Sequence, residues 1–308
     1  MRIFRGKYLS IQKISKIIFA IGVAWLLVQC QSSGSAVKNS ADSKITESER
    51  NYKLPDINLD HWKVTIPAGE GKGGAVSVEP PEILDYGTNE VLRPYMYSDS
   101  TAGALVFYAY PSDATTANTK YSRSELREQI VPGDDDANWT FEEGGNLKAT
   151  IEMEEVSKDD EGKYHKVIVL QIHGRLTDDQ KELIGQKDNN APPILKIYWD
   201  KGKIRVKTKE LKFLGTSDEG LLYEEAWGDD EGYTFNEEVG FKKFDMEIDV
   251  SDGKLVVSLN NNEFKTYDNI HMEKWGVFEN YFKAGNYLQT TDKDAFAKVK
   301  FYELEVSH

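Results

Sequence analysis

The sequence predicts an all-β domain built from antiparallel strands, and three observations lead to this fold class. Short segments alternate apolar and polar residues, as in "GALVFYAY" (103–110) and "YHKVIVLQIHG" (164–174), which is typical of strands with one buried face. Asp-Gly, Lys-Gly and Asn-rich turns join several of these segments and indicate hairpins. Long helical periodicity is scarce, and residues 177–186 are the main candidate for a short helix. An antiparallel sandwich or jelly roll accommodates this many short strands.

The first thirty residues stand apart from this fold and have the pattern of an export signal. A leader with five Lys and Arg residues precedes an apolar run from Ile17 to Val28, which is shorter than a membrane span of about 20 residues. Cys30, the single cysteine, closes the run and resembles the lipid-attachment cysteine of bacterial lipoproteins, although Gln29 stands where such signals carry a small residue. We expect an exported outer-membrane or cell-surface lipoprotein of a Gram-negative bacterium, which touches the membrane only through this anchor. An ordinary secretory signal with an incidental cysteine is the alternative.

Residues 31–53 are rich in Ser, Lys and Glu and lack apolar periodicity, so they predict a flexible linker. The composition is globular from residue 54 to residue 308. This length suits one all-β sandwich, and without an internal repeat or second linker we expect one domain and a monomer.

The charge balance restricts the partners of this domain. The chain carries 38 Lys and Arg against 52 Asp and Glu, a formal charge of −14, and removal of the leader leaves 33 basic residues and a charge of −19. Nucleic-acid binding requires a basic footprint, so this acidic balance argues against it. Clustered positive charge is therefore informative wherever it occurs.

The later strands follow in order along the second half of the chain. Each alternates β-branched or aromatic residues with polar ones and ends at a turn signal. The predicted segments are 194–200 and 203–209 around a Lys-Gly turn, 244–250 and 254–260 around an Asp-Gly turn, 264–267 after an Asn-rich turn, and 297–306 at the end.

One strand has an unusual polar face. In "YSRSELREQ" (121–129), Arg123, Glu125, Arg127 and Gln129 share one face, because side chains alternate along a strand. A solvated salt-bridge ladder on an outer face would explain this pattern. The alternative is the floor of a groove that binds an anion.

Two further strands carry polar faces of the same kind. The segment "LQIHG" (170–174) places Gln171 and His173 together, with Leu170 and Ile172 directed to the core. In "YFKAGNYLQ" (281–289) one face carries polar side chains, the other faces the core, and Gly285 leaves room on the polar face for a close approach. The polar residues of this third strand are Tyr281, Lys283, Tyr287 and Gln289, and its core-facing residues are Phe282, Ala284 and Leu288.

Each strand alone has a common structural explanation, such as a surface pair or a buried histidine with satisfied hydrogen bonds. Together, however, they supply a candidate base (His173), a candidate acid (Tyr287), an amide donor (Gln171) and guanidinium groups. This set suits cleavage beside a carbon that bears a carboxylate.

The three blocks "YSRSELRE", "LQIHG" and "YFKAGNYLQ", in this order, resemble the signature blocks of the alginate lyases of polysaccharide lyase family 7. The segments "LDHWKVTIP" (59–67) and "ALVFYAYPSDATTANTKYSRSELRE" (104–128) resemble that family's domain start and the approach to its first block. The resemblance runs from about residue 57 to the C-terminus. It implies a β-jelly roll with a concave groove that binds alginate, a polymer of mannuronate and guluronate, or its oligosaccharides.

The resemblance also implies the reaction, which is β-elimination: the proton at C5 of a uronate is removed and the oxygen at C4 is expelled. One of the two block arginines, with Gln171, would bind the carboxylate and stabilise the charge that develops there; the sequence leaves open which arginine. Neutral His173 would be the base for guluronate and Tyr287 the acid, whereas Tyr287 could serve as both for mannuronate. No metal or organic cofactor is required. The residues carried over as catalytic are His173, Tyr287, Gln171 and Arg123, and those expected to contact substrate are Arg127, Glu125, Lys283, Tyr281 and Gln289.

Finer roles follow from the same resemblance. Glu125 would fix the geometry of the arginines, and Lys283 would hold a neighbouring carboxylate or lower the pKa of Tyr287. Ile172, the middle residue of the second block, is associated in the family with a preference for guluronate and would act through packing.

Further expectations concern the surroundings of the groove. The hairpin 194–209 could add subsites through Lys196, Tyr198, Arg205 and Lys207. Segments 185–193 and 214–240 could close one end of the groove, which would favour exolytic action on alginate. The acidic runs 133–139 and 226–233 are either solvated loops or structural calcium sites.

Two rival functions remain at this point. Glu247, Asp249 and Asp252 are reminiscent of the acidic strand of laminarinase-type glycoside hydrolases, which need two carboxyl groups flanking the bond; Asp252 lies instead in an Asp-Gly turn. A non-catalytic surface lipoprotein that captures acidic polysaccharide would keep the arginines and aromatics but would have no use for paired His173 and Tyr287.

Overall fold

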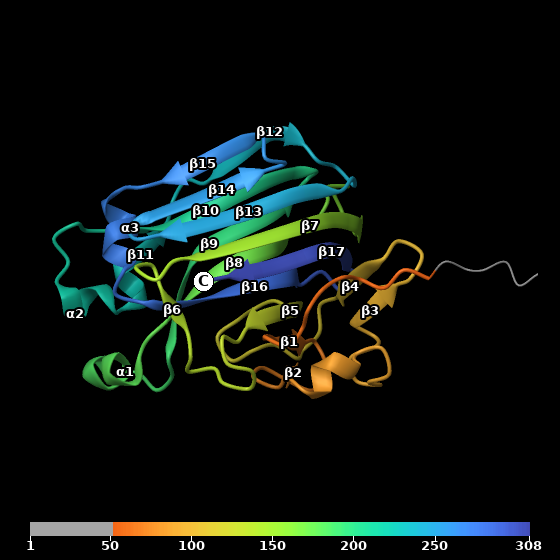
Figure 1. Cartoon of the computed structure of the whole chain (residues 1–308), viewed down its shortest axis with the longest axis horizontal. Coiled ribbons are helices and arrows are strands. Elements are labelled where there is room, and N and C mark those ends of the chain that lie inside the picture. The colour runs from red at the N-terminus through yellow and green to blue at the C-terminus, as the bar shows by residue number, and fades with distance from the viewer. Residues whose placement is uncertain (1–51) are drawn as a thin grey trace, which may run out of the picture. The chain divides into compact units, whose positions relative to one another are not determined.

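A computed structural model describes residues 52–308 of the protein (Figure 1). The predicted export signal (1–30) with its lipidation site at Cys30, and nearly all of the predicted linker (31–53), lie outside the described residues. Within residues 52–308, no helix is both long and apolar enough to cross a membrane.

The described domain consists of two antiparallel β-sheets packed face to face (Figure 1), which confirms the predicted all-β jelly roll. The larger sheet has ten strands, in the order β11 (Trp227–Asp229), β10 (Lys203–Leu211), β9 (Asn190–Asp200), β8 (Val167–Arg175), β16 (Glu279–Leu288), β5 (Arg123–Glu128), β1 (Trp62–Ile66) and β2 (Val76–Val78), with β12 (Tyr233–Glu238) paired to β10 and β6 (Trp139–Thr140) paired to β16. The smaller sheet has seven, in the order β15 (Glu263–Tyr267), β14 (Lys254–Leu259), β13 (Phe244–Ser251), β7 (Gly145–Val156), β17 (Ala297–Ser307), β4 (Ala104–Ala109) and β3 (Met96–Asp99).

Helices in residues 52–308 are few and short, as the scarcity of helical periodicity predicts. They are α1 (Asp178–Ile184), α2 (Asp218–Leu221), α3 (Ile270–Trp275) and the 3₁₀ helices η1 (Glu82–Asp85) and η2 (Glu224–Ala226). The predicted helix 177–186 is α1, whose first turn is closed by a capping box between Thr177 and Gln180. It ends at Gly185, whose φ of 68° is the left-handed conformation that glycine adopts most readily.

The core lies between the two sheets and is formed by the apolar positions of the alternating strands. Leu170 and Ile172 of β8 and Phe282, Ala284 and Leu288 of β16 are fully buried in it, as predicted. Because side chains alternate along a strand, burial of these residues places the polar residues between them on the outer face of the ten-stranded sheet.

A β-bulge in β8 interrupts this alternation. The register against β9 shifts between Ile168 and Leu170, and both Val169 and Leu170 belong to the core. Ile168 consequently points to the outer face and lines a cavity there. Strict alternation with Leu170 and Ile172 would have directed it to the core.

Glu128 is a buried carboxylate on the core side of β5. It accepts hydrogen bonds from Trp139 Nε1 (3.0 Å) and from the backbone N–H of Phe282 (2.9 Å), and its other oxygen lies 2.7 Å from His308 Nε2. These partners offset the cost of removing the carboxylate from water. Glu128 also joins β5 to β16 from behind the polar face.

Candidate active site

The three polar strands, far apart in sequence, are neighbours in the ten-stranded sheet in the order β8, β16, β5. Tyr287 lies opposite Arg123, and Lys283 lies opposite both Arg127 and Gln171. Tyr281 lies opposite His173. Since adjacent strands are about 4.8 Å apart, these paired polar side chains form one surface patch.

Lys283 is part of a polar row that crosses six successive strands. Its members, each directly opposite the next, are Lys63, Arg127, Lys283, Gln171, Lys196 and Lys207. Five of the six are cationic residue types, in a chain whose formal charge is −14. Sequence reasoning missed Lys63, although alternation in "WKVTI" would have placed it outward, because Trp62, Val64 and Ile66 are buried.

Glu125 is the anionic centre of this patch and is fully buried. Its carboxylate accepts hydrogen bonds from Arg123 Nη1 (2.9 Å) and Gln171 Nε2 (2.5 Å), and Lys283 Nζ lies 2.6 Å away. Although burial favours the neutral form, the charges of Lys283 and Arg123 hold the pKa of Glu125 below its ordinary value. With both oxygens engaged by protein groups, Glu125 is placed to position its three neighbours.

The two block arginines have different surroundings. The guanidinium of Arg127 donates to the carbonyls of Glu128 (2.6 Å) and Asp135 (2.8 Å) and to Asn138 Oδ1 (3.0 Å). Arg123 donates one hydrogen bond to Glu125, and its buried Nε has no partner among the described residues. Arg123 therefore has fewer protein partners than Arg127, which is engaged by the loop that follows β5.

His173 is placed as a neutral base. Its Nδ1 lies 3.0 Å from the carbonyl of Gly174, to which a protonated Nδ1 donates, so Nε2 carries the free lone pair. Burial and the positive charge of Lys283 lower the pKa of His173 to about 3. The imidazole stacks on Tyr281 with ring centroids 5.3 Å apart, which fixes its plane.

Tyr287 and Lys283 lie on β16 beside this base. The ring of Tyr287 packs against the Arg123 guanidinium at 3.8 Å, and burial raises the pKa of its hydroxyl although Arg123 opposes the shift. Tyr287 is therefore protonated and suited to donate a proton. Burial and the charge of Arg123 lower the pKa of Lys283 to about 8.

Two adjoining cavities, of about 600 Å³ and 460 Å³, extend over the patch, and both are lined by Arg123 and His173. Two loops contribute Asn118 and Asp188 to the lining of both cavities, and a hydrogen bond from Asn118 Nδ2 to Asp188 Oδ2 (3.2 Å) joins them. Thr119, from the first loop, lines the larger cavity together with Tyr287. Sequence reasoning missed Asn118 and Thr119 because nothing in a polar loop sequence indicates what the loop covers.

Most of the other residues predicted to contact substrate line one of the two cavities, but Arg205 does not. Lys196, Tyr198 and Gln289 line the larger cavity, and Tyr281 the smaller one. Lys196 is held by Asp229 at 2.9 Å. Arg205 is engaged elsewhere, since its guanidinium donates to Thr234 Oγ1 (2.9 Å) and to the carbonyl of Glu231.

Glycine is required at position 285 for a different reason from the predicted one, which was room for a close approach on the polar face. Its φ of 145° is unfavourable for other residues, and a Cβ there would lie 2.6 Å from the carbonyl oxygen of Ser124. The close approach is therefore made by the backbone of the neighbouring strand β5, not by a ligand.

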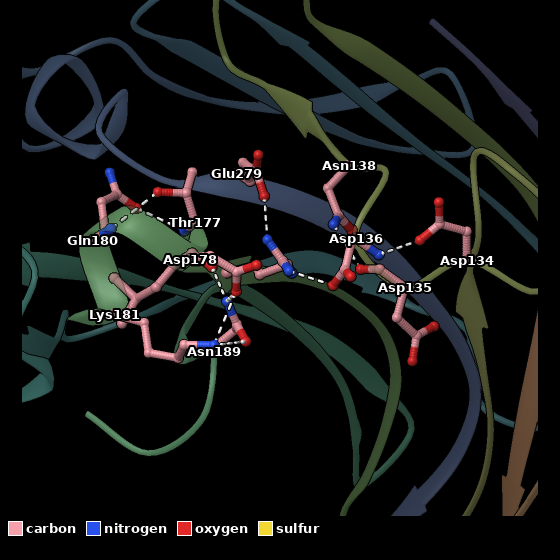
Figure 2. Close-up of polar contacts among 12 residues, drawn as sticks. Asp134, Asp135, Asp136, Asn138, Thr177, Asp178, Gln180, Lys181, Asn189 and Glu279 are labelled. Carbon is pink, nitrogen blue, oxygen red and sulfur yellow. Dashed lines mark hydrogen bonds and ion pairs between the residues drawn. The ribbon is translucent and has the colours of Figure 1, made fainter. Parts of the chain in front are cut away.

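The acidic runs pair with cations. In the run 133–139, Asp136 binds Arg175, whose guanidinium is held from its other side by Glu279 at 2.6 Å (Figure 2). In the run 226–233, Asp229 binds Lys196 and Lys209 at 2.9 Å. Among residues 52–308 no group of three or more His, Cys, Asp or Glu is placed to hold a metal ion.

The acidic residues of the hydrolase alternative lie away from the patch. Glu247 and Asp249 are on β13 of the seven-stranded sheet, where both accept hydrogen bonds from Asn146. Asp252 follows in the turn between β13 and β14. The polar face of β5, β8 and β16 is on the other sheet.

Comparison with known proteins agrees with this geometry. Residues 57–308 match the family model described as alginate lyase. An alginate lyase of Klebsiella pneumoniae is 28% identical over 303 residues, covering 82% of this chain and 90% of the relative. The crystal structure of alginate lyase A1-II', a member of polysaccharide lyase family 7, is 30% identical with a TM-score of 0.64, covering 81% of this chain and 95% of that one. A variant of that enzyme with a histidine and a tyrosine replaced, solved with substrate (GGMG), is 28% identical with a TM-score of 0.64, over 81% of this chain and 93% of that one.

Proposed function

The chain belongs to the alginate lyase family and is a polysaccharide lyase of family 7, and we propose that it acts preferentially on guluronate-containing alginate, with His173 as base and Tyr287 as acid. The observation that carries this proposal is the opposite protonation of two groups on one patch. Burial leaves His173 unprotonated and Tyr287 protonated near neutral pH, so each starts in the state that its role requires.

In the proposed first step, the patch binds the carboxylate of the sugar that loses its C5 proton. The Arg123 side chain lines both cavities, and the amide of Gln171 has a second N–H beyond the one that donates to Glu125. Hydrogen bonds from these donors strengthen as negative charge develops on the carboxylate, so they favour the transition state over the bound substrate.

In the following steps, His173 Nε2 takes the C5 proton and Tyr287 gives its proton to the leaving C4 oxygen. A separate base and acid are what guluronate requires, whereas the mannuronate route needs Tyr287 to accept a proton first. The raised pKa of Tyr287 makes its phenolate costly to form, which supports guluronate preference. Ile172, fully buried between Gln171 and His173 in sequence, supports the same preference by fixing the backbone that carries both.

We further propose that the enzyme removes short units from chain ends. The Asn118–Asp188 hydrogen bond joins two segments that line the groove. Gln186, Asp188, residues 190–193 and Glu224 line the larger cavity, which supports walls formed by segments 185–193 and 214–240. A long polymer is hindered from lying across such a groove, whereas a chain end can enter it.

The test is ultraviolet absorbance of residues 54–308 incubated separately with polyguluronate and polymannuronate, with chromatographic sizing of the products. We expect absorbance from the conjugated double bond of the new ends, faster with polyguluronate, and short products from the earliest time points. Equal rates on both polymers would contradict the guluronate preference. Early products of many lengths would contradict end cutting.

The pH profile of this reaction should have an alkaline limb set by Lys283. Because the pKa of His173 is lowered to about 3, the base stays unprotonated and the rate should be flat from about pH 5 to 7. As pH rises through about 8, Lys283 loses its proton and the patch loses one positive charge, so the affinity for alginate should fall. Lys283→Arg keeps the charge and should move this limb to higher pH in initial-rate measurements. An acid limb near the ordinary histidine pKa of about 6.5 would contradict the role of His173.

A further inference from the structure

One carboxylate of the protein itself occupies the groove floor. Asp135, in the loop after β5, pairs with Lys63 Nζ and lies 3.2 Å from Arg127 Nη1, and its Oδ1 also accepts a hydrogen bond from Gln129 Nε2 at 3.0 Å. Lys63 and Arg127 are adjacent members of the polar row that continues through Lys283. All three cations and Asp135 line the smaller cavity, and the side chain of Asp135 is 45% exposed there.

The surroundings of Asp135 resemble those that a bound uronate would need. Its carboxylate is held by an ammonium, a guanidinium and an amide N–H. Lys283, Arg123 and Gln171 provide the same three kinds of donor elsewhere on this face. Although burial favours the neutral form, the hydrogen bond from Lys63 and the charge of Arg127 hold the pKa of Asp135 below its ordinary value. It is therefore charged, as a uronate carboxylate would be.

The neighbouring acid in the loop has a different role. Asp136 pairs with Arg175, which Glu279 also binds, and Figure 2 shows the carboxylate of Asp135 turned away from that pair. The loop is further anchored by its own backbone, since Arg127 Nη2 donates to the carbonyl of Asp135 (2.8 Å) and Asn138 Nδ2 does the same (2.8 Å). This anchoring holds the Asp135 side chain against the row.

We propose that Asp135 ends the substrate groove by occupying, with its own carboxylate, the Lys63–Arg127 cation pair that would otherwise bind one more uronate. Lys63 lies two strands from Lys283, about 10 Å across the sheet, so the groove stops a short distance beyond the reacting sugar on this side. The inference rests on the proposed function and assigns Asp135 as the residue that limits product length.

Asp135→Ala tests this assignment. Removing the carboxylate frees Lys63 and Arg127 for a sugar carboxylate, while the backbone contacts to Arg127 and Asn138 remain. We expect longer products in chromatographic sizing. We also expect kcat/KM on polyguluronate, divided by kcat/KM on short guluronate oligomers, to rise about tenfold, which is the effect of one added charge-assisted hydrogen bond. The KM for polymer should also become more sensitive to salt, because two unpaired cations then face the substrate.

Asp136→Ala is the matched control, since it removes the same charge from the same loop and leaves Arg175 paired with Glu279. Its products should have the lengths of the parent's. Should Asp135→Ala fold poorly, Asp135→Asn keeps the side-chain volume, removes the charge, and should lengthen products in the same direction. Unchanged product lengths in a folded Asp135 variant, or equal lengthening by Asp136→Ala, would overturn the proposal. Failure of the proposed function is a separate result, in which the parent itself gives no unsaturated product.

Discussion

Tyr287→Phe should lower kcat on polyguluronate about a thousandfold, within the range of general acid catalysis, and leave oligosaccharide affinity nearly unchanged. Phenylalanine keeps the ring that packs on Arg123 at 3.8 Å and the edge contact with Tyr121. Only the hydroxyl is lost, and with it the proton for the leaving C4 oxygen. Initial rates from ultraviolet absorbance, together with calorimetric binding of a guluronate oligomer, separate the two effects.

Tyr281→Phe provides the comparison, because Tyr281 lies on the same strand and face and stacks on His173 and Arg127. Tyr281 transfers no proton in the proposed mechanism, so the kcat of the Tyr281→Phe variant should fall by less than about tenfold. A Tyr287→Phe enzyme that retains most of its kcat would place the acid elsewhere. A joint loss of kcat and affinity would indicate that the hydroxyl mainly binds substrate.

Glu125→Ala should cause the largest loss of stability among single substitutions in the patch. Glu125 is fully buried with Arg123 and Lys283 around it, and removal of one partner of a buried ion pair costs about 3–5 kcal/mol because the other charges are left uncompensated. For a domain of this size, such a loss lowers Tm by roughly 10 °C. Chemical denaturation measures the free energy of unfolding directly. Glu155→Ala, which removes an exposed partner of Lys298, should cost less than about 1 kcal/mol.

Glu125→Gln distinguishes positioning from simple stability. It keeps the side-chain shape but removes the negative charge that opposes the lowering of the Lys283 pKa. The pKa of Lys283 should fall further below about 8, and the alkaline limb of the rate should move to lower pH. An unshifted limb in a folded variant would show that Glu125 does not act through Lys283.

The fold class and the polar residues of the three central strands could be predicted from sequence, whereas Lys63 on the neighbouring strand was missed. Alternation in three segments was enough to separate Leu170, Ile172 and Phe282, which are buried in the core, from Gln171, His173 and Lys283, which share the outer face. This works because side-chain direction in a strand is a local property with a period of two. The three family blocks then identified which outer-face residues belong together, although not how they pair.

Only the tertiary structure distinguished residues that are equivalent in sequence pattern. Arg123 and Arg127 occupy like positions on one strand, yet Arg127 is engaged by Asp135 and Asn138 of a loop, whereas Arg123 keeps an unpaired N–H. The bulge that turns Ile168 outward, and the contact of Gly285 with β5, are likewise invisible to a strict period of two. The physical reason is that charge pairing, pKa and close packing depend on groups brought together from distant segments, and a local pattern contains no information about those neighbours.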